Sequence, residues 1–361
     1  NIKRVGIIFL AVAIICLMAI GCLSVNSVAN NGSNVTGSSL NNEQNNISAD
    51  VEDNEQKESA SEEVVIPSAD RVYTLTGDCD SMAEGWQKAV KESEETGSSV
   101  KVILGNNWTA KADSTYTTSF GSGYAFEKGI IVVPVGCHIV LDLAGKTIDR
   151  ALTSMQDYGK VFFIYGTLEI IDSNYDMKNL YPKYNEILAN ATQSSLEEKR
   201  AFVTAELKKL PIGRITGAYE KNIFANSYKI GATINIASNA TLNIYGGMFV
   251  NNQGTHGAVL GAMRDSVVNI YDTIMLENTS TSDGGCIFSV GQCNIYNGLY
   301  INNTGSQGIF YATRTDINAV AQGTINIYDG VYSFNQNNSE GHGVMYAYKG
   351  GTLNIYGGEI S

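Results

Sequence analysis

The most regular pattern along the chain is Asn-Ile-Tyr between apolar residues, written five times. The copies begin 26, 25, 32 and 28 residues apart, at Asn243, Asn269, Asn294, Asn326 and Asn354. In each copy the residues on both sides of Asn are apolar, as Leu242 and Ile244 are in the first. Apolar residues at alternate positions indicate a strand with one buried face. We therefore expect the Asn and the Tyr of every copy to point outward.

A tight turn and two more apolar segments follow each copy. The residues after Tyr are mostly Gly, Asn or Asp, which tolerate the backbone angles of a sharp turn. Segments such as Met248-Phe249-Val250 and Gly257-Ala258-Val259 come next. Three short strands in a period of about 25 residues predict an all-β fold, a parallel β-helix of about seven coils.

An N-terminal helical cap is expected before the coils. Ser81 and Glu84 have the spacing of a capping box, which predicts a helix that ends near Gly97. A buried strand at residues 100–104 follows. Such a cap would shield the open edge of the first coil.

A helical insertion interrupts the coils at about residues 175–211. Ser195 and Glu198 form a second capping box, and Pro211 is expected to end the helix. The predicted apolar stripe contains Leu196, Val203, Leu207 and Leu210. We expect this insertion to pack on the side of the β-helix; a lid or a partner contact is the alternative.

The coil type Thr241-Leu242-Asn243-Ile244-Tyr245-Gly246-Gly247 and the segment from His138 to Ile148 resemble the pectate-lyase-like superfamily. The resemblance covers residues 71–361 and implies a right-handed parallel β-helix. Within the superfamily the chain looks most like repeat-bearing, adhesin-like surface proteins. The superfamily hosts lyases, hydrolases, adhesins and inert scaffolds, so the resemblance indicates the fold and not the activity.

The N-terminus is typical of an export signal, predicted at residues 1–23. Lys3 and Arg4 precede an apolar run at residues 5–23. Three outcomes stay open. Ala19-Ile20-Gly21-Cys22 resembles a bacterial lipobox, with Cys22 as the lipid attachment site. Ser27-Val28-Ala29 offers an ordinary cleavage site, and the apolar run is long enough to remain as a membrane anchor. Each outcome places the rest of a bacterial protein outside the cytoplasm, at the cell surface or secreted, with membrane contact through this segment only.

Residues 24–70 are predicted to be a disordered tether that precedes the β-helix domain at 71–361. This stretch is acidic, rich in Asn, Ser and Glu, and nearly free of large apolar side chains. At the other end, the repeat is interrupted at Ser361, so we expect further coils or a wall anchor to follow.

The charge of the chain and the spacing of its cysteines indicate which partners and metal sites are not expected. The formal net charge is -12, and no basic stripe of the kind that nucleic acids require is present. Four cysteines lie outside the signal, without metal-ligand spacing: Cys79, Cys137, Cys286 and Cys293. We expect buried free thiols, with Cys79–Cys137 or Cys286–Cys293 bridges as alternatives. No cofactor and no metal site are predicted, and the oligomeric state is left open.

No residue is assigned a catalytic role. Gly341-His342-Gly343 resembles a short element of polygalacturonases, but the paired aspartates that hydrolysis needs are missing. A lyase would need a basic residue and acidic calcium ligands on one face. Arg264, Asp265, Arg314, Asp316 and Lys349 fall on one corner, but ordinary surface ion pairing is the interpretation we favour for them. The aligned aspartates Asp172, Asp272 and Asp329 suggest turn geometry rather than metal binding.

The outward Asn and Tyr residues are the candidate ligand-binding surface. The Tyr row contains Tyr245, Tyr271, Tyr296, Tyr328 and Tyr356, and the Asn row contains Asn243, Asn269, Asn294, Asn326 and Asn354. Stacked about 4.8 Å apart, the rows would form a flat stripe able to hold a glycan or a host-surface ligand, or one that only stiffens the coils. We therefore predict a non-catalytic, adhesin-like surface scaffold; the alternative is a lyase or hydrolase acting on acidic polysaccharide.

Overall fold

The computed structural model describes residues 65, 67–69, 71–109, 119–120, 124–125, 129–221, 231–313, 323–339 and 343–361. Contacts divide the chain into one unit at Asn1–Ala60 and a second at Ser61–Ser361. The described residues belong to the second unit. The predicted export signal, with Cys22, and nearly all of the tether therefore lie outside the described residues.

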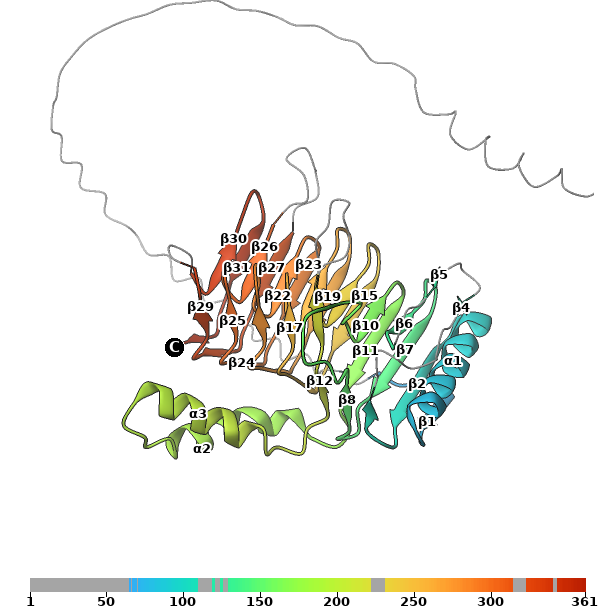
Figure 1. The fold of residues 1–361 in the computed structure, drawn as a ribbon, viewed down its shortest axis with the longest axis horizontal. Helices are drawn as coiled ribbons and strands as arrows, with labels where there is room; N and C mark the ends of the chain where they lie inside the picture. The colour runs from blue at the N-terminus through green and yellow to red at the C-terminus, as the bar shows by residue number, and fades with distance from the viewer. Residues whose placement is uncertain are drawn as a thin grey trace, which may run out of the picture. The chain divides into compact units, whose positions relative to one another are not determined.

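Four parallel sheets form the second unit (Figure 1). We number them I to IV in the order in which the chain visits them in one coil. Sheet I contains, in spatial order, β1 (Arg71–Leu75), β2 (Ser99–Leu104), β7 (His138–Asp142), β11 (Thr167–Ile171), β15 (Thr241–Ile244), β19 (Val267–Ile270), β23 (Gln292–Ile295), β27 (Thr324–Ile327) and β31 (Thr352–Ile355). Sheet II contains β3 (Trp108–Thr109), β8 (Thr147–Asp149), β12 (Arg214–Thr216), β16 (Met248–Val250), β20 (Ile274–Leu276), β24 (Leu299–Ile301), β28 (Val331–Ser333) and β32 (Glu359–Ile360).

The other two sheets complete the coils. Sheet III contains β9 (Gln156–Asp157), β13 (Tyr219–Lys221), β17 (Gln253–Gly254), β21 (Thr279–Ser280), β25 (Thr304–Gly305) and β29 (Gln336–Asn337). Sheet IV contains β6 (Ile131–Val133), β10 (Phe162–Ile164), β14 (Ile234–Ile236), β18 (Leu260–Ala262), β22 (Ile287–Ser289), β26 (Phe310–Ala312) and β30 (Met345–Ala347). A separate antiparallel pair joins β4 (Ser119–Phe120) and β5 (Tyr124–Ala125).

The stacking of strands from successive coils makes the unit a parallel, solenoid-like β-structure, compatible with a β-helix. Equivalent residues pair in register, so that Asn243, Asn269 and Asn294 are direct neighbours across sheet I. The sequence predicts three strands per coil, and the structure adds the two-residue strands of sheet III. A two-residue strand is too short to leave an alternating pattern, which is why the sequence did not reveal it. The strands of sheet IV also begin two to three residues later than their opening Gly suggests, as β18 does relative to Gly257.

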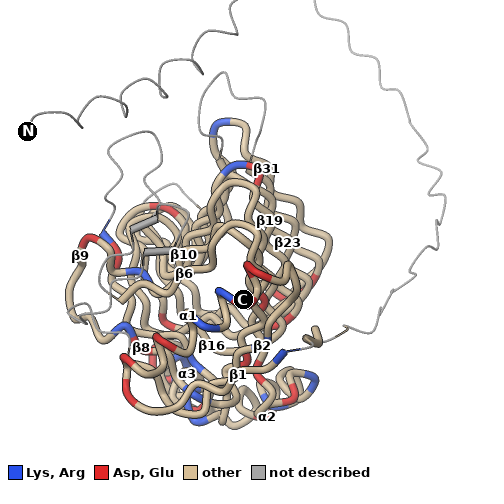
Figure 2. Tube along the Cα trace, turned by 90° about the vertical axis from the view of Figure 1, so that its right-hand side faces the viewer, with Lys and Arg blue, Asp and Glu red and all other residues tan. Residues whose placement is uncertain are grey.

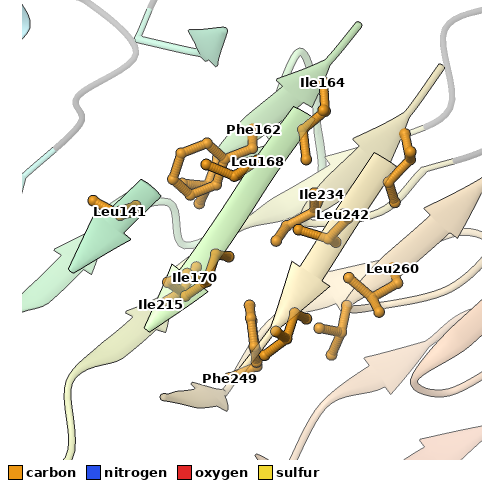
Figure 3. Packing of buried hydrophobic residues seen from close by; sticks show 14 of the residues in the cluster. Leu141, Phe162, Ile164, Leu168, Ile170, Ile215, Ile234, Leu242, Phe249 and Leu260 are labelled. Carbon is orange, nitrogen blue, oxygen red and sulfur yellow. The ribbon is translucent and has the colours of Figure 1, made fainter. Parts of the chain in front are cut away.

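The hydrophobic core lies inside the coils. It consists of inward residues from sheets I, II and IV, such as Leu242, Phe249 and Leu260, all of which are fully buried (Figure 3). The apolar residues on both sides of each Asn are buried as expected, except in β31, where Ile355 is 50% exposed. Burial of these apolar faces between neighbouring coils is the main stabilising contribution to such a repeat structure.

A ladder of buried Asn side chains lies at the bend between sheets II and III. It is separate from the outward Asn row expected on sheet I. Asn252, Asn278, Asn303 and Asn335 stack in consecutive coils. The amide oxygens of the last three each accept from the backbone N–H and the side-chain amide of the preceding Asn. Their own amide groups also donate to backbone carbonyls, as Asn278 does to Phe249 at 2.9 Å. The ladder therefore pairs backbone groups that the bend between the two sheets would otherwise leave unsatisfied.

The helical insertion between β11 and β12 contains η1 (Met177–Asn179), α2 (Leu180–Ala189) and α3 (Leu196–Leu207). The α2–α3 hairpin packs on the outer face of sheet II, as predicted (Figure 1). The apolar surface between them contains Leu180, Tyr184, Ile187, Val203, Leu207 and Leu210 from the insertion and Met248, Ile274, Leu299 and Val331 from the sheet. The hairpin thus covers the coils of sheet II whose outward residues are apolar.

Two details of the insertion differ from the prediction. The capping box of Ser195 and Glu198 is confirmed. Leu196, however, is 72% exposed and does not belong to the buried stripe, because the first helical residue lies at the outer end of the hairpin. The helix ends at Leu207, four residues before Pro211, since Lys208 to Leu210 turn toward β12.

Helix α1 (Cys79–Thr96) packs beside β1 and β2. Its apolar face joins the core, and Trp86 Nε1 donates to the carbonyl of Val132 at 2.9 Å. The predicted end at Gly97 is confirmed, with a left-handed backbone. The predicted start was wrong: the N-cap is Asp78, whose carboxylate accepts from both the backbone N–H and the hydroxyl of Ser81. Both hydrogen bonds lower the pKa of Asp78.

All four cysteines of the described part are free thiols, so neither alternative bridge is present there. Burial raises the pKa of the Cys137 thiol to about 11 and that of Cys293 to about 12. Among the described helices, none is both long and apolar enough to cross a membrane.

Candidate ligand-binding face

The outer surface of sheet I carries three straight rows of side chains, which we call the ladder face. Strands β15, β19, β23, β27 and β31 each contribute two outward residues, and the residue after each strand contributes a third. The first row contains Thr241, Val267, Gln292, Thr324 and Thr352; the second contains Asn243, Asn269, Asn294, Asn326 and Asn354; the third contains Tyr245, Tyr271, Tyr296, Tyr328 and Tyr356. The structure thus brings together all ten residues that the sequence singled out.

The Tyr row is one continuous aromatic stack. Successive ring centroids are 4.6, 5.0, 5.0 and 5.0 Å apart, and the interplanar angles are 6 to 13°. Exposure increases along the row from half-buried Tyr245 and Tyr271 to Tyr296 at 38%, Tyr328 at 42% and Tyr356 at 66%. The spacing agrees with the strand separation of a parallel sheet.

This geometry turns the ring faces toward one another. A sugar approaching the middle of the row meets ring edges and hydroxyl groups rather than an open aromatic face. At the first ring, burial raises the pKa of Tyr245, and the neighbouring Glu169 and Tyr271 raise it further, partly by hydrogen bonds to its hydroxyl group. Contacts with a ligand would therefore be mainly polar along the row.

The Asn row is a hydrogen-bonded amide ladder. The Nδ2 atoms of Asn269, Asn294, Asn326 and Asn354 each donate to Oδ1 of the preceding Asn, at 2.8 to 3.0 Å. A side-chain amide has two N–H donors and an oxygen with two lone pairs. The ladder uses one donor and one lone pair of each inner Asn. The second N–H of each inner Asn remains for a ligand on the outer side, and so does the second lone pair of Asn269 and Asn326. The oxygen of Asn294 also accepts from Nε2 of Gln292 at 3.3 Å.

The ladder face is uncharged, and charges lie around it. The fifteen residues of the three rows contain no Lys, Arg, His, Asp or Glu, and Figure 2 marks where charged residues lie along the trace. At the β7–β11 end, His138 Nε2 lies 2.5 Å from Glu169 Oε1, and Lys101 pairs with Asp142 at 3.0 Å. The three uncharged rows therefore stop at these ion pairs, next to the first coil of the ladder face, which contains Tyr245.

Acidic turn residues border the Tyr row, and their carboxylates bind the turn backbone. Asp272 accepts from the N–H of Thr273, and Asp329 accepts from that of Gly330. Asp172, two coils before Asp272, accepts from Gly145 and Gly213. The predicted role in turn geometry is confirmed. Burial raises the pKa of Asp272 to about 7.

The corner on the other side of the rows holds the residues considered for a lyase. Arg264 pairs with its neighbour Asp265 at 3.2 Å, and both side chains are half exposed, as expected for a surface ion pair. Lys349 Nζ lies 4.9 Å from the ring centroid of Tyr348. Arg314, Asp316 and His342 lie outside the described residues.

Two polar groups escaped the sequence analysis. His256 Nδ1 lies 3.0 Å from Asp283 Oδ2 in the next coil. Lys160 and Glu220 form a fully buried ion pair, and the buried Arg150 donates to the carbonyls of Lys160 and Tyr158. These partners lie 8 to 60 residues apart in the sequence, so no local spacing signals them.

Groups of three or more His, Cys, Asp or Glu side chains able to hold a metal ion are absent from the described residues. Comparison with known proteins gave no family model that matches the chain. Neither the curated proteins nor the solved structures contain a match.

Proposed function

We propose that the chain is a non-catalytic, adhesin-like scaffold, exported to the cell surface or secreted, whose ladder face binds a glycan. In this proposal the domain is a right-handed parallel β-helix of the pectate-lyase-like type, and residues 1–70 export and tether it. The observation that carries the proposal is the ladder face: three uncharged rows repeated over five coils. The second N–H of each inner Asn repeats the same donor from coil to coil.

The repetition itself favours binding over catalysis. Cleavage of a polysaccharide needs distinct acid and base groups at one place on the substrate. Every coil of the ladder face presents Asn and Tyr in the same positions, so no coil differs from its neighbours in acid–base chemistry. A repeated surface instead adds many weak contacts along an extended ligand.

The test is a glycan array and polysaccharide pull-down with the full chain, read for binding and for cleavage products. Tyr296→Ala removes the central ring of the Tyr row. Tyr348→Ala is the matched control, because Tyr348 has the same 38% exposure but lies on another part of the surface. We expect binding without cleavage, reduced about five-fold or more by Tyr296→Ala and unchanged by Tyr348→Ala.

Two outcomes would contradict the proposal. No binding to any glycan would leave the ladder face as a stiffening element only. New reducing ends or unsaturated products would identify an enzyme acting on polysaccharide, the alternative suggested by the corner of Arg264 and Lys349. Circular dichroism of both variants is the control for intact folding.

A further inference from the structure

We infer that the ligand of the ladder face is a neutral, extended β-1,4-linked glycan that runs along the stack with one sugar per coil. This inference rests on the proposed function and specifies its ligand. Three observations support it: the repeat distance of the rows, the hydrogen-bonding groups that each coil presents, and the distribution of charge.

The repeat distance matches an extended glycan. Neighbouring rings in the Tyr row are 4.6 to 5.0 Å apart. A β-1,4-linked chain of pyranose units is a straight ribbon that advances by nearly this distance per sugar. An α-1,4-linked chain coils and loses register with a straight row after a few units. The ladder face therefore favours the ribbon geometry.

Each inner coil offers an amide donor to one sugar. Every inner Asn keeps one N–H outside the ladder bonds, and Asn269 and Asn326 also keep one oxygen lone pair. The oxygen of Asn294 accepts from Gln292 as well as from the ladder. The strand rise of about 3.3 Å per residue places the two outer rows about 13 Å apart. This width suits a single glycan chain, whose equatorial hydroxyl groups both donate and accept.

The charge distribution favours a neutral chain. An acidic polysaccharide with one carboxylate per sugar would place each carboxylate over a coil that presents no Lys or Arg on the ladder face. Carboxylate recognition normally uses Arg or Lys. The exposed Asp329 borders the Tyr row and would repel a polyanion. On the opposite side, Arg264 already pairs with Asp265.

The experiment is isothermal titration of the full chain with oligosaccharides of two to seven units. Neutral β-1,4-linked series of glucose, mannose, xylose and N-acetylglucosamine are compared with α-1,4-linked glucose oligomers and with oligogalacturonides. We expect at least one β-1,4 series to bind roughly three- to ten-fold more tightly for each added sugar. For a protein of residues 1–361 the gain should stop at about five units, the number of coils that present both rows in this stretch.

A shortened ladder gives the sharper test. The double variant Asn354→Ala/Tyr356→Ala removes the last step of both rows, in the most exposed coil. The length at which affinity stops rising should shift from five units to four, while shorter oligomers keep their affinity. The control Asp265→Asn changes a charge at the neighbouring corner and should leave the length dependence as it is.

The outcomes separate the inference from the proposed function. Glycan binding that does not depend on length, or that is as tight for α-1,4 oligomers, would overturn the inference and leave the proposed function standing. Tighter binding of oligogalacturonides would also overturn the inference and leave the proposed function standing. If no glycan binds in the array or the titration, both are wrong.

Discussion

The buried Asn ladder allows a sharp stability prediction, because the chain contains its own control. Asn278→Ala removes a fully buried amide that makes four side-chain hydrogen bonds. Asn269→Ala makes the same substitution in the outer Asn row, where the amide is half-buried and has two ladder partners. The two variants lose the same side-chain atoms from adjacent stretches of one coil.

The expected costs differ because water reaches only the outer row. After Asn278→Ala, the backbone N–H of Asn252 and the carbonyl of Phe249 each lose a partner inside the protein. A buried polar group left unpaired costs about 1–3 kcal/mol, so we expect a loss of about 3–5 kcal/mol in the free energy of unfolding. For Asn269→Ala, water can replace the lost partners, and the expected loss is below about 1.5 kcal/mol.

Urea unfolding of the full chain measures both values, and native-state hydrogen exchange shows which coils open. The amides of β16, β20 and β24 should lose protection in Asn278→Ala and keep it in Asn269→Ala. A solenoid can unfold in parts, so the exchange data are needed if the unfolding curve has more than one transition. Equal losses in the two variants would refute the view that the buried ladder satisfies backbone groups that water cannot reach.

Three further predictions concern other parts of the molecule. Leu207→Ala should lower the free energy of unfolding by about 2–5 kcal/mol in denaturant, because it leaves a cavity under the α2–α3 hairpin. The control Leu196→Ala, at an exposed position, should change this free energy by less than about 0.5 kcal/mol. Asp272 has a pKa of about 7 in the folded state, above the value of about 3.9 in unfolded chains, so its contribution to stability is present below pH 4 and is lost as pH rises to 7. The variant Asp272→Asn should therefore show a smaller fall in the unfolding free energy over this range, and an unchanged fall would contradict the assignment. Lys160→Met should cost about 3–5 kcal/mol by leaving the carboxylate of Glu220 unpaired, and adding Glu220→Gln should restore much of the loss, as thermal unfolding of the single and double variants would reveal.

The ladder face was predictable because it depends on local information repeated many times. Alternation of apolar and polar residues specifies which side chains of a strand point outward, whatever the rest of the molecule does. The recurrence of Asn-Ile-Tyr then specifies the register, since in-register stacking puts like residues side by side. The ten Asn and Tyr positions and the strands after each turn followed from these two features, and the helical insertion followed from its own capping box and apolar stripe.

Other features depend on contacts between coils and could not be inferred within one repeat. Asn252 belongs to the buried ladder, whereas its neighbour Asn251 has a left-handed backbone. The two residues take different roles because of the path that the chain follows between sheets II and III. The pair of Lys160 and Glu220 joins residues sixty positions apart. The choice of Asp78 over Ser81 as N-cap depended on where β1 ends, since both residue types cap helices well.

The sequence by itself therefore determined the repeat, the outward rows and the parallel stacking, because each is a property of one short strand copied in every coil. The tertiary structure decided that the Tyr rings present edges and hydroxyl groups rather than faces, which sheet the α2–α3 hairpin covers and which polar groups become buried partners. Those outcomes depend on distances between coils and on insertions of variable length. They arise only when all coils are stacked, since a side chain's neighbours in the next coil are about 25 residues away in the sequence.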